Sequence, residues 1–540
     1  MSERDRTPEN LQRVVENYLQ LGNRFESPPK VLLKLRTQSV DGQELTSRDI
    51  AVTTAVQCYA PGVAAFKERT DEKSLQIQGS TLDAGHHTTR MHTNYTWQIV
   101  GATRSVTHEI FHSYPFYNSE QQSQRYVEAK EGNYLVPKDI PSEHEAYFRS
   151  VASFENSAYF RLLDALHPGI EERVRVMYPA GSWRVESTKQ RLETKANKLC
   201  QEVARYVLSI GQLTTFDHTL NEISLLRLFR ASLQEKFPDE ARFIIGSMIS
   251  QVAVCDPSII GELDFPLERY RETQPDERHI LEEKHRFDQN LGPRSSLMLN
   301  SQGVSDGVLI NSARIVLGMP PSACSDSEVL SRLMDPVKNK FLADVYETGM
   351  LDPLTTVLRS VSIAYATKLS HTADSQRQRQ RRTPGATPRV EMIYDGSPDF
   401  ITPMVIRDDL KLQEMYTEIM VKIFGDVGAA IKMGIPKETA LLLLPNATTL
   451  RLVESGDLFD WLHRWKQRLC FTAQEEICFI SMEQTAQLAE VMPESAPMLL
   501  APCGIRKTAG VSPRCPEGDK WCGQPVYNWT LDKYKENRLI

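Results

Sequence analysis

The spacing of hydrophobic positions divides the chain into helices and strands of ordinary length. Residues 11–22, LQRVVENYLQLG, carry apolar side chains at helical spacing and end at a glycine, so we expect residues 1–40 to form a helical lead-in. Residues 95–101, YTWQIVG, alternate apolar and polar side chains, which is typical of a half-buried strand. Residues 188–211 and 223–237 have the spacing of amphipathic helices. The first half of the chain is therefore predicted to mix helices and strands.

The second half follows a similar order of elements. A basic stretch, residues 371–390, is expected to be a loop, and residues 409–434 form a long helical pattern that ends at a glycine. Residues 455–492 begin with a good N-cap and predict one long or two short helices. Both halves share the order helix, strand, polar loop, helices, apolar turn and helix, which suggests a diverged tandem repeat. The polar and charged residues 265–306 between the halves are expected to form a linker.

Composition excludes several classes of protein. The chain has 540 residues, enough for two to four domains, and its 41% hydrophobic and 25% charged residues are ordinary for a globular protein. A net charge of -7 argues against a strongly basic nucleic-acid binder, so we expect no nucleic-acid partner. The N-terminus lacks the apolar segment of a signal peptide, and the longest aliphatic run is too short to span a membrane. The nine cysteines then indicate reduced thiols in a cytoplasmic protein.

Two groups of possible metal ligands occur along the chain. Three histidines lie between residues 86 and 92, on an expected loop that runs into a strand, which is poor geometry for zinc. A polar ligand-binding or structural role is favoured for them. Cys503, Cys515 and Cys522 lie in a turn-rich tail and could hold zinc only with a fourth ligand, and their spacing matches no common zinc finger. We predict no metal site and leave the role of the cysteines open.

A second basic feature points to anion binding. Residues 377–389, RQRQRRTPGATPR, would place Arg377, Arg379 and Arg381 on one side of an extended segment. Guanidinium groups suit phosphate or carboxylate, although without other information the favoured interpretation is a solvated basic loop. The sequence contains no glycine-rich phosphate loop, nucleophile elbow or kinase motif. The residues alone therefore predict a protein with anion-binding loops and no more.

Residues 85–127, GHHTTRMHTNYTWQIVGATRSVTHEIFHSYPFYNSEQQSQRYV, carry motifs that resemble the flavin-dependent thymidylate synthases. That family has Gly-His-x-Thr, a His before a strand, Gly-x-x-Arg, Gln-x-x-Arg-His-Arg and Ser-x-Arg-Tyr. The matching residues here are Gly85, His86, Thr88, His92, Gly101, Arg104, Ser123, Arg125 and Tyr126. Further on, Arg205 falls on an arginine that binds the nucleotide phosphate in the family.

The second half resembles the same family again. Residues 441–477 fit its last conserved block without a gap and place Arg468 on the arginine that contacts the uracil ring. Residues 375–382, SQRQRQRR, fit Gln-x-x-Arg-His-Arg as Gln376, Arg379, Gln380 and Arg381. The resemblance covers most of residues 45–260 and 307–525. It implies an α+β fold with two tandem domains, each a twisted, mainly antiparallel sheet with helices packed around it. We expect the first domain at 1–264, the linker at 265–306 and the second domain, with its cysteine-containing tail, at 307–540.

Each copy departs from the family pattern in a different half. In the first copy, Glu109, His112, Ser113 and Tyr114 replace Gln-x-x-Arg-His-Arg, one residue is inserted before Ser123, and Ser232 stands where the ring-contacting arginine should be. In the second copy, Leu441 replaces the phosphate-binding arginine, and no Ser-x-Arg-Tyr is found. In the family, these two halves of a nucleotide site come from different subunits of a tetramer. We therefore expect a composite site with one half from each copy, the opposite pairing being degenerate.

The resemblance implies reductive methylation of dUMP to dTMP, with FAD as cofactor and NADPH and methylenetetrahydrofolate as co-substrates. Arg468 would be catalytic, because a cation beside the uracil ring stabilises the charge that develops on it. The residues expected at the nucleotide substrate are Ser123, Gln124, Arg125, Arg205, Gln376 and Arg379. Those expected at FAD are His86, Thr88, Gln121 and Arg381. A homodimer would imitate the tetramer and hold two working sites. The alternatives are one-carbon transfer to another pyrimidine nucleotide and a non-catalytic relative that binds nucleotide or flavin.

Overall fold

The computed structural model of the chain describes residues 7–111, 117–265 and 276–540 and contains two four-stranded sheets with the same topology. The first has the order β1-β2-β4-β3 and the second the order β5-β6-β8-β7, and every described strand pair is antiparallel. The strands are β1 Lys30–Arg36, β2 Asn94–Thr103, β3 Tyr117–Gln121, β4 Leu213–Asn221, β5 Ser296–Met298, β6 Ser362–Ser370, β7 Gly385–Ala386 and β8 Thr449–Asp457. The shared order confirms the expected α+β fold and its tandem arrangement.

Helices cover the sheets and join their strands. In the first repeat they are α1 Pro8–Gln20, α2 Ser47–Gln57, α3 Asp71–Asp83, α4 Arg104–Ile110, α5 Glu145–Met177, α6 Glu186–Ala204, α7 Glu222–Ser232 and α8 Asp239–Cys255. In the second repeat they are α9 Glu277–Leu291, α10 Asp306–Leu317, α11 Asp326–Met334, α12 Pro353–Thr356, α13 His371–Arg377, α14 Val390–Ile393, α15 Met404–Arg407, α16 Leu410–Lys432, α17 Lys437–Leu441, α18 Leu458–Arg468, α19 Glu475–Val491, α20 Pro502–Thr508 and α21 Leu531–Glu536.

The same local signals build both sheets. Along β2, Tyr95, Trp97 and Ile99 are at most 1% exposed, so the alternating pattern turns one face of the strand into the core, as expected. The last residue of β4, Asn221, caps α7, and the last residue of β8, Asp457, caps α18. Each side chain accepts a hydrogen bond from a backbone N–H in the first helical turn, which is why both strands pass directly into helices.

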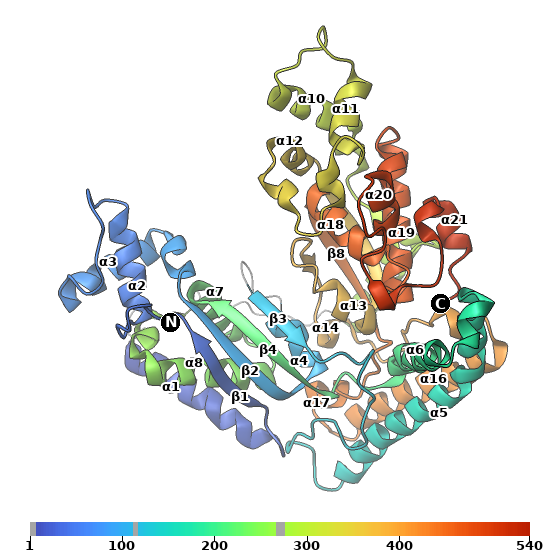
Figure 1. Cartoon of the computed structure of the whole chain (residues 1–540). Coiled ribbons are helices and arrows are strands. Elements are labelled where there is room, and N and C mark those ends of the chain that lie inside the picture. Colours follow the sequence, from blue (N-terminus) through green and yellow to red (C-terminus); the bar gives the residue numbers. More distant parts are fainter. Residues whose placement is uncertain (1–6, 112–116, 266–275) are drawn as a thin grey trace.

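The two repeats share one hydrophobic core. The sheets form the arms of a V, and helices α5, α6, α16 and α17 fill its base (Figure 1). Apolar residues from all four helices belong to a single buried cluster, which includes Leu162, Val203, Phe424 and Ala440. Two helical pairs from different repeats therefore pack as one body, and their apolar burial holds the arms at this junction.

A pseudo-twofold axis passes through the junction. Ser209 shortly precedes β4, Pro445 holds the corresponding place before β8, and the two residues pair with each other in an antiparallel bridge. The bridge is extended by backbone bonds from Ile210 N to Leu444 O at 2.8 Å and from Asn446 N to Leu208 O at 2.7 Å. Corresponding residues of the repeats therefore face each other, which brings the start of β4 beside the start of β8.

Several local expectations change in detail. The lead-in contains not only α1 but also the edge strand β1, and the stretch expected as a basic loop begins with α13. Within the expected linker, α9 and β5 lie in the described part, so the second sheet begins before residue 307, and the proposed domain boundaries remain a prediction. Residues 455–492 form two helices, α18 and α19. Across the described ranges, no helix has the length and apolar character needed to cross a membrane.

Candidate functional site

Two short helices flank the junction of the repeats. Helix α4 follows β2 and begins after Thr103, whose N–H and hydroxyl donate to the buried Glu240 at 2.7 and 2.6 Å. Helix α13 follows β6 and begins after Ser370, whose N–H and hydroxyl donate to Glu476, both at 2.6 Å. A glutamate thus fixes the start of each helix in the same way, the buried Glu240 for α4 and the partly buried Glu476 for α13. The motifs that follow α4 and α13 are consequently held at defined positions beside the axis.

The Ser-x-Arg segment of the first repeat forms a compact turn at the end of β3. The hydroxyl of Ser123 accepts from the backbone N–H of Arg125 at 3.2 Å, which is a typical serine turn. Arg104, at the start of α4, donates from Nη2 to the carbonyl of Gln122 at 2.9 Å. The turn is therefore fastened to α4, and Arg104 has a positioning role that its motif alone did not predict.

This turn reaches the second repeat. Arg125 forms an ion pair with Glu202 of α6 and donates from Nη2 to the carbonyl of Thr472, beyond α18, at 2.9 Å. Asn446 of the second repeat donates from Nδ2 to Gln124 at 3.3 Å and to the carbonyl of Arg205 at 3.1 Å. The sequence analysis missed Asn446, although its place in the gap-free second block was available as a signal.

The second repeat supplies the other half of the site. Arg468, at the end of α18, donates from Nη2 to the carbonyl of Gln376 on α13 at 2.7 Å. Arg379 donates to the carbonyl of Gln121 at 3.4 Å, and Arg381 to that of Ser119 at 3.5 Å. The second repeat's arginine loop therefore lies along β3 of the first repeat. One chain brings together the residues expected at the nucleotide: Ser123, Gln124, Arg125, Arg205, Gln376, Arg379 and Arg468.

The electrostatics of this cluster favour an anion. Burial, and then the positive charges of Arg464, Arg379 and Arg125, lower the pKa of Arg468 to about 9. Burial, and then Arg205 and Arg379, lower the pKa of Arg104 to about 9. Each guanidinium is destabilised by burial and by like charges, so an anion placed among these groups would relieve the repulsion.

Unused hydrogen-bond donors support the same conclusion. Arg205 is 3% exposed, and its Nη2 has no partner within the described structure. The Nε atoms of Arg104 and Arg468 and the Nε2 of Gln376 are likewise buried without a partner in the described part of the chain. Buried polar groups are seldom left unpaired, and several such donors within one cluster of residues indicate a missing acceptor. A phosphate, with its several acceptor oxygens, matches these donors.

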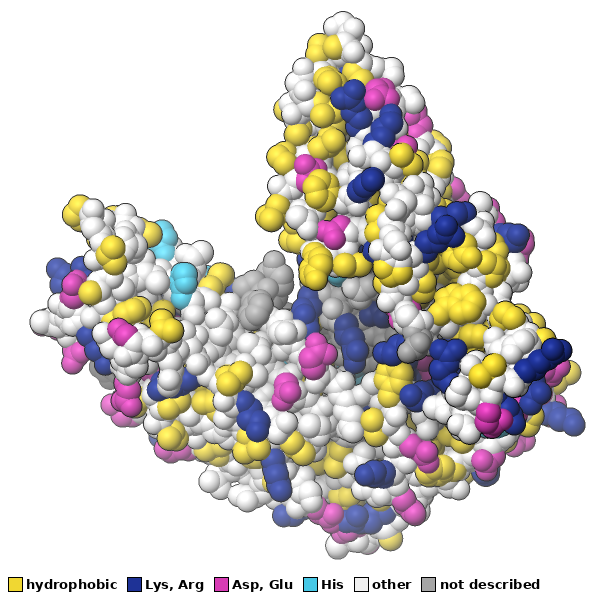
Figure 2. Space-filling model, viewed as in Figure 1, with side chains coloured by type: hydrophobic (Ala, Val, Ile, Leu, Met, Phe, Trp, Pro, Cys, Tyr) yellow, Lys and Arg dark blue, Asp and Glu magenta, His cyan; other side chains and the backbone are white. Residues whose placement is uncertain are grey.

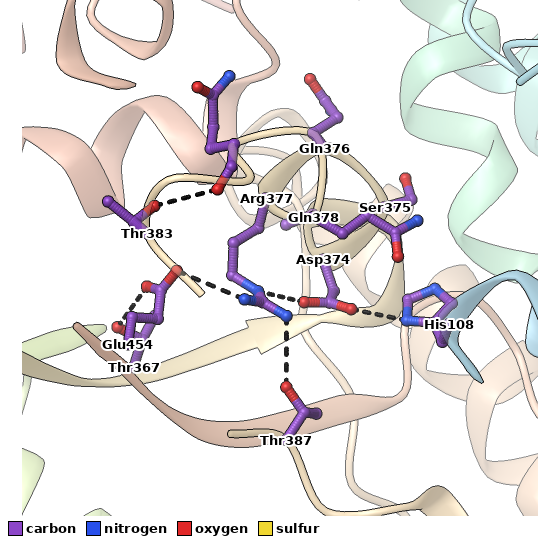
Figure 3. A network of polar contacts seen from close by, with 12 residues as sticks. His108, Thr367, Asp374, Ser375, Gln376, Arg377, Gln378, Thr383, Thr387 and Glu454 are labelled. Atoms are coloured by element: carbon purple, nitrogen blue, oxygen red, sulfur yellow. Dashed lines mark hydrogen bonds and ion pairs between the residues drawn. The ribbon is translucent and has the colours of Figure 1, made fainter. Parts of the chain in front are cut away.

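A buried network holds the arginine loop in place (Figure 3). Arg377 of α13 pairs with Asp374, lies 3.7 Å from Glu454 of β8 and donates to Thr387 at 3.3 Å. Asp374 also meets Nδ1 of His108, from α4 of the first repeat, at 2.6 Å. The fully buried Arg377 is thus saturated and cannot bind substrate, whereas the exposed Arg379 and Arg381 can. The expected common side for these three arginines is therefore wrong, because the segment begins in a helix.

Arg125 and Arg468 line one cavity of about 770 Å³ between the repeats. Lys and Arg side chains gather in the hollow at the base of the V (Figure 2). Of the described residues that line the cavity, nine are Lys or Arg and four are Asp or Glu. Such an excess of positive charge in a concave site attracts and concentrates anionic ligands.

A second cavity, of about 390 Å³, lies on the other side of the axis. There Arg389 donates to the carbonyl of Lys236 at 2.8 Å, in the same way as Arg125 donates to that of Thr472. Residues 387–389, Thr-Pro-Arg, follow β7 and are thus the second repeat's counterpart of Ser-x-Arg. The sequence analysis found no such motif, because serine has become threonine and the following tyrosine has become valine.

The second cavity is lined by more acidic than basic residues. Leu441 lines it at the place that corresponds to Arg205, and Arg389 lies 3.6 Å from Glu109, the counterpart of Gln376. Of its described lining residues, three are Lys or Arg and six are Asp or Glu. Acidic groups repel phosphate, so we expect this cavity to bind anions more weakly than the first.

The remaining expected residues lie elsewhere or cannot be placed. His86 and Thr88 are exposed, beside or within the 3-10 helix η3 (His87–Met91), which packs against α2 and α7 of the first repeat. Their contacts in the described structure do not reach the arginine cluster. His112, Ser113 and Tyr114 lie outside the described residues. Within the described ranges, no group of three or more His, Cys, Asp or Glu side chains is arranged to hold a metal.

Comparisons with known proteins match both repeats to one family. The model of the thymidylate synthase complementing protein family matches residues 43–258 and again residues 301–494. A flavin-dependent thymidylate synthase of Clostridium tetani is 26% identical over 213 residues, which cover 39% of this chain and 79% of that protein. One from Mycobacteroides abscessus is 26% identical over 186 residues, or 34% and 67% of the two chains.

Among solved structures, the UMP/dUMP methylase PolB from Streptomyces cacaoi, bound with 5-Br dUMP, is similar with a TM-score of 0.30. It is 16% identical, and the match covers 44% of this chain and 94% of that one.

Proposed function

Because the chain belongs to the thymidylate synthase complementing protein family, we propose that it methylates dUMP to dTMP at a site built from both of its repeats. The membership confirms the resemblance seen in the sequence, the tandem arrangement and the expectation of a methyltransferase-like enzyme. One observation carries the composite site: Arg125 of the first repeat and Arg468 of the second line the same cavity. Each repeat keeps the half of the motif set that the other has lost.

In this proposal the first repeat binds the phosphate. Arg125 and Arg205, with the Ser123 turn, face the junction, and Nη2 of Arg205, which is buried without a partner among the described residues, supplies a donor. Arg125 is already paired with Glu202, so its net attraction for phosphate is partly offset. Arg205 feels the charges of Glu202 and Glu476 but forms no direct ion pair in the described structure, so we infer that it is the stronger phosphate ligand of the two. Fixing the phosphate orients the ring and lowers the entropic part of the barrier.

The second repeat acts on the ring. Arg468 is held by the carbonyl of Gln376, which leaves its buried Nε without a partner in the described structure. A cation at the oxygen edge of uracil stabilises the negative charge that develops when C5 becomes nucleophilic. Because Arg468 is preorganised by α18 and α13, it needs no costly rearrangement when the charge appears. Gln380 replaces the histidine of the family motif, so no titratable ring acts at that position.

The residues expected at FAD offer suitable chemistry. Arg381 is exposed beside Arg379, and Nε2 of Gln121 is buried without a partner in the described structure. A cation and a free donor suit the phosphates of FAD, which when bound supplies the reducing chemistry, with NADPH as reductant and methylenetetrahydrofolate as carbon donor. His86 and Thr88 lie apart on η3, so we infer that a second copy of the chain completes each flavin site. A homodimer with two working sites follows from this placement.

The test is direct. Purified protein should show the visible spectrum of bound flavin and convert dUMP to dTMP when given methylenetetrahydrofolate and NADPH, as measured by chromatography of the nucleotides. Parallel reactions with UMP and dCMP distinguish dUMP from other pyrimidine acceptors. Turnover of another acceptor in place of dUMP would change the assigned substrate. Bound flavin or nucleotide without turnover of any acceptor would identify a non-catalytic relative.

A further inference from the structure

The C-terminal tail, residues 495–540, lies beyond the segment that matches the family, yet it borders the candidate site. The family match ends at residue 494, and α20 and α21 follow. The tail lines the same cavity as Arg125 and Arg468. It supplies charged and aromatic side chains that include Arg506, Lys520, Trp521, Tyr527 and Arg538. A part of the cavity wall therefore lies outside the segment that the family model matches.

The tail is fastened to the first repeat across the cavity. The hydroxyl of Tyr178, after α5, donates to the carbonyl of Trp521 at 2.6 Å, and Arg173 of α5 donates to that of Leu539 at 2.6 Å. Gly523 has φ +87°, and a Cβ there would lie 2.8 Å from the carbonyl oxygen of Met177. Only glycine allows the backbone to approach α5 so closely. The tail thus bridges the repeats, and the C-terminus lies beside α6 (Figure 1).

The wall made by α6 and the tail is basic, and it contains charged groups and hydrogen-bond donors that a ligand could use. Lys198 and Lys520 are both exposed and both line the cavity, Lys198 from helix α6 and Lys520 from the tail. Burial, with the charge of Arg191, lowers the pKa of Lys195, which lines the same wall. Arg538 is 6% exposed, and its Nε and Nη1 have no hydrogen-bond partner in the described structure. Arg538 already interacts with the carboxylates of Glu475 and Glu202, whereas Lys198 and Lys520 form no ion pair in the described structure and are available to an anionic ligand.

We propose that α6 and the C-terminal tail form a second anion subsite, which takes an anionic extension of a ligand held in the cavity. Two ligands of the proposed reaction provide that chemistry: the glutamate carboxylates of the folate co-substrate, and further phosphates on a nucleotide. Lysine and arginine on a partly enclosed wall bind either group through charge-assisted hydrogen bonds. The inference rests on the proposed function and adds a selectivity that the matched family segment does not contain.

Charge reversal on this wall provides the test. Lys198→Glu and Lys520→Glu change exposed side chains, so folding should be retained, as checked by circular dichroism. Lys189→Glu is the matched control, because Lys189 lies on α6 but outside the cavity lining. Isothermal titration measures the Kd of dUMP and dUDP, and steady-state kinetics compare KM for monoglutamyl and polyglutamyl methylenetetrahydrofolate. Each cavity variant should weaken the binding of one of the longer ligands about tenfold more than the binding of its shorter counterpart. A tenfold loss of affinity is about the size of effect expected when one charge-assisted hydrogen bond is lost.

The outcomes separate the possibilities. A selective rise in KM for polyglutamyl folate assigns the subsite to the folate, and a selective rise in Kd for dUDP assigns it to the nucleotide. If both cavity variants match Lys189→Glu while wild-type protein binds dUMP, the second subsite is overturned and the proposed function stands. If wild-type protein binds no dUMP, the proposed function falls and the subsite with it.

Discussion

Ser209 and Pro445 hold corresponding places in the two repeats and pair with each other in an antiparallel bridge. A residue paired with its own counterpart marks a twofold axis, so a single chain reproduces an interface between two like subunits. Around such an axis two corresponding cavities are expected, and two of the cavities in the described structure, of about 770 and 390 Å³, lie on its two sides. Divergence has left one basic and the other acidic. The chain is thus organised as a dimer of domains, and we expect anion binding at the basic cavity.

Replacing Arg205 by leucine tests phosphate binding. Leucine is chosen because Leu441 occupies the corresponding place in the second repeat, where the same fold accommodates it. Arg205→Leu should fold and should weaken dUMP binding about 10- to 100-fold. This loss of affinity corresponds to the free energy of one hydrogen bond to a charged group. Titration calorimetry measures the Kd. Arg389→Ala, which alters only the acidic cavity, should leave that Kd unchanged. Equal loss in both variants would contradict the assignment of the phosphate to one cavity.

Arg468→Ser tests the role of the second repeat in the same manner, since Ser232 occupies the corresponding place in the first. Loss of a preorganised cation next to the ring should lower kcat by about 10²- to 10³-fold, with a smaller change in the Kd of dUMP. Single-turnover kinetics separate the chemical step from binding. An unchanged kcat together with a raised KM would make Arg468 a binding residue only.

Gly385→Ala tests the network that holds the arginine loop. A Cβ at Gly385 would overlap Nη1 of Arg377, whose guanidinium is already fixed by Asp374, Glu454 and Thr387. We expect a lower thermal midpoint and lower activity, because displacing Arg377 disturbs the adjacent Arg379 and Arg381. Gly169→Ala, in α5, is the control, since a Cβ there meets nothing within 4 Å. Wild-type behaviour of the Gly385 variant would show that the network is dispensable.

The buried carboxyl of Glu475 predicts how the stability of the folded chain depends on pH. Burial is the main cause that raises the pKa of Glu475 from 4.5 to about 7, and one of its oxygens has no partner in the described structure. Between these pH values Glu475 keeps its proton in the folded chain but loses it in the unfolded chain. The free energy of unfolding therefore falls as the pH rises from 4.5 to 7, by at most about 3 kcal/mol for this group. Glu475→Gln removes the titration. Its thermal midpoint relative to wild type should therefore rise from pH 4.5 to pH 8. A constant difference would contradict the assignment.

The sequence predicted the repeat, the strand β2 and the two halves of the site, because hydrophobic periodicity and contiguous motifs survive divergence. It missed residues whose roles depend on folding. Asn446 becomes a site residue only when the repeats come together, and the positioning contact of Arg104 with Gln122 exists only in the folded first repeat. The charged surface of α9 is typical of a linker, which is why the sequence does not predict this helix. The Thr387 to Arg389 turn was missed because threonine and valine replace the serine and the tyrosine of the motif. His86 and Thr88 match the family motif, yet nothing local indicates how far they lie from the arginine cluster.

The claim that one chain holds a complete nucleotide site is tested most directly by mixing two inactive variants. Arg205→Leu and Arg468→Ser chains are co-expressed or refolded together, and dTMP formation is compared with that of each variant alone. Because Arg125 and Arg468 line one cavity of the same chain, no mixed assembly contains an intact site, and activity should stay at the sum of the two variants. Recovery of a sizeable fraction of wild-type activity would show that the halves meet between chains and would contradict the account.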